Sequence, residues 1–152
     1  MGDIMIIDET TKEVEALAEA LAKNLLGKQL KKAIEINRLA GSVKSPSFDG
    51  MPKGTPNGNA SEIMMVKVSD CRQLIRQVSE TLTKFNTDEF IALQEHYLHD
   101  KSAIAIARKL MVSRATVYRL IDKGLLEFVY AYNRGELLNE AAEQLASNKQ
   151  LA

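Results

Sequence analysis

The chain has 152 residues and a mass of 16.9 kDa, with 45% apolar residues, 26% charged residues and no net charge. This is a globular composition, and it excludes both a uniformly basic histone-like coat and a supercharged disordered tail. The single cysteine, Cys71, excludes an internal disulfide and a cysteine-based zinc site. No apolar run approaches the roughly 18 residues of a membrane span. The first residues also lack the basic start of a signal peptide, so we expect a soluble, cytoplasmic protein.

Residues 1–41 are predicted to form an N-terminal helical segment. Thr10 begins the Thr-x-x-Glu spacing of a capping box, and apolar residues recur behind it at every third or fourth position. Gly27 is expected to bend the helix, and Gly41 is a natural stop. This helix and the long helix that follows the next loop are predicted either to pair in antiparallel fashion or to form a dimer seam.

Residues 42–60 are predicted to be a Pro/Gly-rich loop. With the preceding Gly41 they hold all three prolines and four of the eight glycines. We expect neither a helix nor a regular strand to form where prolines and glycines are this frequent. A loop of this length is uncommon inside a domain, so it is either a linker or a functional loop. Its candidate contacts to a DNA backbone or a protein partner are Lys44, Phe48, Met51 and Lys53.

Residues 61–134 are predicted to be helical. Ser61 is placed to cap a long helix whose apolar positions form one stripe from Met64 to Phe85, and Thr87 is placed to open the next helix. In the tail, residues 135–152, an amphipathic pattern predicts a last helix that docks on the core or on another subunit. No stretch alternates with a period of two, so the predicted fold class is all-α.

Residues 102–121 have the pattern of a helix-turn-helix. Ser102 is placed to cap a short helix with Ile106 and Ala107 on its inner face. A three-residue turn follows, and Ser113 is placed to cap a second helix. The small side chain of Ala107 lets the second helix cross closely over the first, as this motif requires.

The turn and the second helix complete the pattern. Met111 stands where such turns usually carry glycine, and a left-handed backbone at a methionine costs about 1 kcal/mol, which a fold tolerates. Val112 fills the turn. Val117, Leu120 and Ile121 are predicted to face the core.

The opposite face of the second helix is predicted to read DNA. The predicted contacts are Ser113, Arg114, Ala115, Thr116, Tyr118, Arg119 and Lys123. The two arginines have the reach to fork onto guanine, Ala115 or Thr116 suits a thymine methyl, and Ser113 and Lys123 suit phosphates. Residues 101–134 hold seven bases against two acids, which favours a polyanion as the partner.

From Phe90 to Phe128 the chain resembles the region-4 domain of bacterial sigma factors. The resemblance follows Tyr97, Ser102, the Ile106-Ala107 pair and the run from Val112 to Arg119 without gaps. It implies a helix-turn-helix that reads duplex DNA. Nothing in the first 86 residues resembles the promoter-melting parts of a sigma factor, so we do not expect a complete one.

The order of elements over residues 28–134 resembles the ArpU/RinA-like phage transcriptional regulators. Its specific feature is the Ser45-Pro46-Ser47 loop between a lysine-rich helix and a long helix. This resemblance implies a phage or prophage activator of late genes for packaging and lysis. The basic helix and loop at residues 28–53 are expected to touch either flanking phosphates or a protein partner such as host RNA polymerase. The alternatives are a small-terminase-like DNA-packaging subunit and a helical protein–protein adaptor.

The remaining motifs are weak. His96 and His99 lack a third ligand at a suitable spacing, so no metal site is expected. No nucleophile motif or phosphate-binding loop occurs, so an enzyme and a cofactor are not expected. The predicted partners are double-stranded DNA, RNA polymerase and a second copy of the chain, with no membrane.

Overall fold

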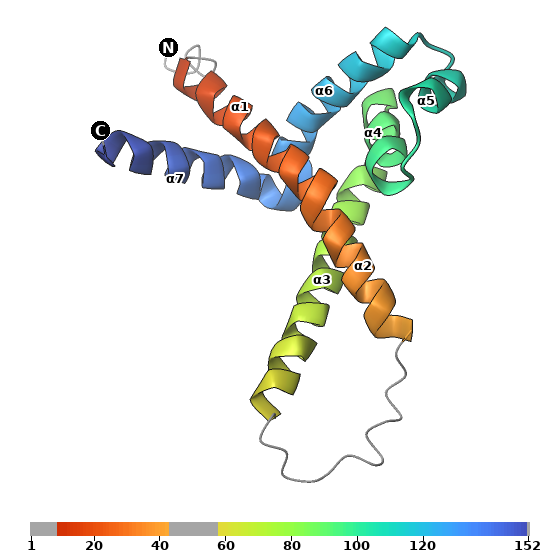
Figure 1. Cartoon of the computed structure of the whole chain (residues 1–152). Helices are drawn as coiled ribbons and strands as arrows, with labels where there is room; N and C mark the ends of the chain where they lie inside the picture. The colour runs from red at the N-terminus through yellow and green to blue at the C-terminus, as the bar shows by residue number, and fades with distance from the viewer. Residues whose placement is uncertain (1–8, 43–57, 152) are drawn as a thin grey trace.

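The computed structural model of the chain describes residues 9–42 and 58–151 (Figure 1). In these residues every regular element is helical, which confirms the all-α prediction. Lys44, Phe48, Met51 and Lys53 lie outside the described residues.

The N-terminal segment is one long helical rod made of α1 (Glu9–Asn24), a π-helical turn η2 (Leu25–Gln29) and α2 (Leu30–Ser42). Gly27, where the sequence predicts a bend, lies in the π-helical turn between α1 and α2. The rod runs through Gly41 to Ser42, so the predicted stop at Gly41 is wrong by one residue. The predicted cap Thr10 lies inside the first turn, since the helix begins at Glu9.

Next come α3 (Gly58–Lys84), α4 (Asp88–Leu93) and the π-helical turn η4 (Gln94–Leu98). Helix α3 begins three residues before the predicted cap Ser61, because extending a helix that is already long costs little per residue. The predicted opening at Thr87 is confirmed: its side chain accepts a hydrogen bond from the backbone N–H of Phe90 at 3.3 Å.

The last elements are α5 (Ala103–Leu110), α6 (Arg114–Ala131), a 3-10 turn η5 (Tyr132–Gly135) and α7 (Glu136–Leu151). Asn133, Arg134 and Gly135 all have positive φ, which redirects the chain between α6 and α7. The predicted tail helix is confirmed and lies beside α1, as Figure 1 shows. Leu137 and Ala141 are its buried residues.

Helix α6 is the centre of the core. It packs against α1, α4, α5 and α7, and its buried side chains include Leu125 and Phe128. The small residues Ala18 and Ala22 let α1 approach closely. The N-terminal segment and the tail therefore share one core with residues 61–134 and do not form separate packing units.

Candidate functional site

Helices α5 and α6 make up the candidate site, and α5 begins at a capped N-terminus. The Ser102 hydroxyl accepts a hydrogen bond from the backbone N–H of Ala105 at 3.2 Å, which confirms the predicted cap. Ile106 and Ala107 are buried, as the sequence predicts. These two side chains hold α5 against the core.

The connection between α5 and α6 is a tight left-handed turn. Met111 has φ 58° and ψ 47°, the conformation predicted for this position. The backbone N–H of Val112 donates to the carbonyl oxygen of Ala107 at 3.0 Å, and that of Met111 to Arg108 at 3.3 Å. This pair of bonds is the Schellman arrangement, which closes the C-terminus of a helix. The Met111 side chain is 90% exposed, so it contributes no packing.

Helix α6 begins at a second serine cap. The Ser113 hydroxyl accepts from the backbone N–H of Thr116 at 3.1 Å and lies 2.9 Å from the Thr116 hydroxyl oxygen. The predicted cap is confirmed. The Ser113 hydroxyl is thus already engaged within the chain, and Thr116, half-buried, is its partner.

The two faces of α6 differ as predicted. Val117 and Ile121 are buried and Leu120 is half-buried. The residues of the opposite face are all exposed: Arg114, Ala115, Tyr118 and Arg119. Over the part of the chain that the structure describes, neither arginine takes part in an ion pair or a side-chain hydrogen bond. Their guanidinium groups are therefore free to bind a ligand.

Lys123 differs from the two arginines. Its amino group lies 3.4 Å from a carboxylate oxygen of Glu89 on α4. Sequence reasoning did not anticipate this pair, because α4 and α6 are far apart along the chain. Lys123 is therefore not a free cation, since its ammonium group already faces the Glu89 carboxylate.

Asp122 is the acidic residue of the exposed side of α6. Burial raises the pKa of Glu19 on α1 above its usual range, and the charge of Asp122 raises it further. Burial also raises the pKa of Tyr97 in η4, and the charge of Asp122 adds a smaller increase. The negative charge thus lies close to α1 and η4.

A glycine that sequence reasoning missed lies where α6 crosses α4. A Cβ atom added at Gly124 would lie 2.9 Å from the carbonyl oxygen of Glu89 and 3.0 Å from Leu93 Cγ. Only glycine permits this approach. The available signal was a glycine in the middle of a helical apolar pattern, which often marks a close contact.

A buried carboxylate connects α5 to η4. Glu95 is 8% exposed and accepts a hydrogen bond from the amino group of Lys109 at 3.0 Å. His99 Nε2 lies 3.9 Å from the same carboxylate. The backbone N–H of Lys101 also donates to the Glu95 carbonyl at 2.9 Å. These contacts position the start and the end of α5, and the sequence held no local signal for them.

The two histidines, His96 and His99, lie in η4 and directly after it. Across residues 9–42 and 58–151, no group of three or more His, Cys, Asp or Glu side chains is placed to hold a metal ion. Nor does any helix of those residues have the length and apolar character to cross a membrane. No protein-family model matches the chain, and no curated protein or solved structure is similar enough to match it.

Proposed function

We propose that the chain is a sequence-specific, double-stranded DNA-binding transcriptional regulator, with α5, the turn at residues 111–113 and α6 as its helix-turn-helix. The observation that carries this proposal is the exposed face of Arg114, Ala115, Tyr118 and Arg119 on the first turns of α6. The rest of α6 is anchored in the core, so these side chains are presented on a rigid support.

In the proposed complex the start of α6 lies in the major groove, which is wide enough to admit a helix. Arg114 and Arg119 fork onto guanine, and Ala115 with the methyl group of Thr116 contacts thymine. Ser113 approaches a phosphate through its backbone, since its hydroxyl caps the helix. Lys123 exchanges Glu89 for a phosphate at the edge of the groove.

The biological role that we propose is activation of late genes in a phage or prophage, working with host RNA polymerase in the cytoplasm. The resemblance to the ArpU/RinA-like regulators supports it.

The proposal is tested by selecting duplex fragments from the source genome with the purified chain and measuring affinity for a selected fragment over a range of salt. Neutralisation of about four to six phosphates predicts that log K falls against log salt with a slope of about −4 to −5. A flat salt response, or no enrichment of any fragment, would contradict the proposal.

A further inference from the structure

A polar cavity lies where the N-terminal rod meets the segment that leads into α5. Its volume is about 250 Å³, and it is lined by six residues: Gly27 and Lys31 of the rod, and His96, Tyr97, Asp100 and Lys101. The two lysines approach the cavity from distant parts of the chain. Because Asp100 is the one acid among these six residues, the cavity favours an anion as its ligand.

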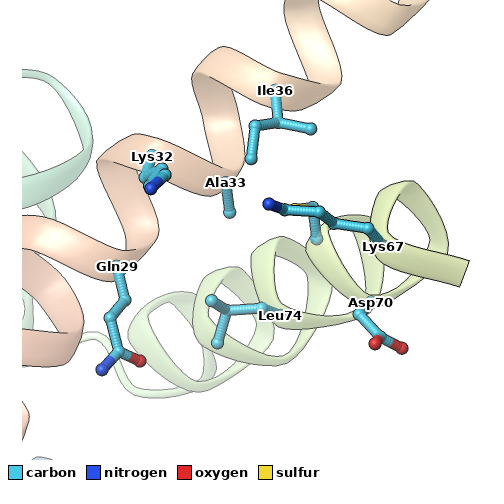
Figure 2. Close-up of a pocket in the computed structure, with 8 residues that line it drawn as sticks. Gln29, Lys32, Ala33, Ile36, Lys67, Asp70 and Leu74 are labelled. Carbon is cyan, nitrogen blue, oxygen red and sulfur yellow. The ribbon is translucent and has the colours of Figure 1, made fainter. Parts of the chain in front are cut away.

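Two contacts fix the position of α2 at this cavity. The amino group of Lys31 lies 2.5 Å from a carboxylate oxygen of Asp100. Ala33 and Ile36 of the same helix point into a separate groove between α2 and α3, as Figure 2 shows. Packing against α3 and the pairing with Asp100 thus hold Lys31 beside the residues that precede α5.

The two lysines keep donors for a further ligand. A lysine ammonium group has three N–H donors, so the bond from Lys31 to Asp100 leaves two of them. Lys101 is exposed, and within the described residues its amino group forms no ion pair. The hydrogen bond from Lys31 lowers the pKa of the Asp100 carboxyl, so Asp100 is ionised at neutral pH. One positive charge therefore remains in excess at the cavity.

The cavity lies at the end of α5 that is remote from the turn. Helix α5 has eight residues and is therefore about 12 Å long. The major groove of DNA is also about 12 Å wide, and the first helix of a helix-turn-helix crosses the DNA backbone. With the start of α6 in the groove, the start of α5 therefore comes close to the phosphates along the edge of the groove.

We propose that this cavity binds a backbone phosphate at the edge of the DNA site, with Lys31 and Lys101 as its cationic donors and Asp100 as a charge that limits the affinity. The proposal rests on the proposed DNA-binding function, and it assigns Lys31 of α2 to DNA and not to a protein partner. Every base pair carries the same phosphates, so this contact adds affinity without sequence preference. The Asp100 carboxylate opposes the contact, because it repels the phosphate.

The test is the affinity of the full chain for a selected duplex and for a scrambled duplex, each measured over a range of salt concentrations. Lys31→Ala and Lys101→Ala should each make the slope of log K against log salt shallower by about 0.9. This change amounts to about 8-fold in affinity between 1 M and 0.1 M salt, and it should be the same for both duplexes. The matched control is Lys149→Ala, which removes an exposed lysine of α7 on the opposite side of the molecule from α5 (Figure 1) and should leave the slope unchanged.

Asp100→Asn tests the role of the acid. Asparagine keeps an oxygen acceptor for Lys31 and tolerates the left-handed backbone at this position, where φ is 53°. Removing the negative charge should raise the affinity for both duplexes by up to about 8-fold at 0.1 M salt, the factor that one lysine contributes. If Asp100 served only to join α2 to this segment, the affinity would not rise.

Ethylation of single duplex phosphates locates the contact. At least one phosphate whose ethylation weakens binding by the unchanged chain should lose this effect with Lys101→Ala. All four substituted positions are exposed, so helix content measured by circular dichroism should stay constant. Unchanged salt slopes for both lysine variants, or an Asp100→Asn variant that binds no better, would overturn the proposal while DNA binding by α6 stands. A flat salt response of the unchanged chain would overturn both the phosphate contact and the proposed function.

Discussion

The turn at Met111 makes a quantitative prediction about stability. A left-handed backbone at a residue other than glycine costs roughly 1–2 kcal/mol, and Met111 has φ 58° and ψ 47°. Glycine removes this strain, but its unfolded chain has more conformational freedom, which opposes the gain by about 0.5–1 kcal/mol. The methionine side chain is 90% exposed, so almost no burial is lost. We expect Met111→Gly to stabilise the fold by about 0.5–1 kcal/mol.

The assay is urea unfolding of the full chain, with thermal unfolding beside it. A gain of this size raises the midpoint temperature by about 2 °C for a chain of this length. Met111→Ala is the matched control: it removes the same exposed side chain and keeps the strain, so its stability should equal the wild type within about 0.5 kcal/mol. The reasoning would be refuted if Met111→Gly were no more stable than Met111→Ala.

Two further substitutions test the packing of α6. Gly124→Ala should destabilise the fold by about 1–2 kcal/mol, because overpacking against the Glu89 carbonyl outweighs the gain in helix propensity. A melting temperature above that of the wild type would show that α4 and α6 are less tightly packed at this position. Val117→Ala should cost roughly 2 kcal/mol, since the side chain is fully buried, and should weaken DNA binding only at temperatures where the fold begins to melt. Lost binding by a fully folded Val117→Ala variant would mean that Val117 does more than pack.

The parts of the structure that depend on neighbours in the sequence were predictable. The sequence predicts that Thr87, Ser102 and Ser113 begin helices, and the hydroxyl of each accepts a hydrogen bond from the backbone N–H three residues ahead. The burial of Val117 and the exposure of Arg114 follow from the helical period once the position of the turn is known.

The stripe on α3 shows what periodicity leaves open. The sequence predicts one apolar face from Met64 to Phe85, but only Val78 and Leu82 on it are fully buried. Met64 and Phe85 are 54% and 42% exposed. Spacing determines which residues share a face of a helix, and it carries no information on whether another element covers that face.

Contacts between distant segments were not predictable from the local pattern. Nothing in the sequence around Lys123 indicates that its amino group lies beside Glu89. Glu95 and Lys109 are 14 positions apart and meet only because η4 and α5 pack together. Such pairs depend on the relative placement of helices, which the helical period of one segment does not contain.

The central claim is that the exposed face of α6 distinguishes one DNA sequence from another. The most direct test compares the affinity of Arg114→Ala and Arg119→Ala for a selected duplex and for a scrambled duplex at the same salt concentration. Each change should cost about 1–3 kcal/mol on the selected duplex and little on the scrambled one. Arg76→Ala, which removes an exposed arginine of α3, controls for the loss of charge and should leave the ratio of the two affinities unchanged. Equal losses on both duplexes for all three variants would contradict the account.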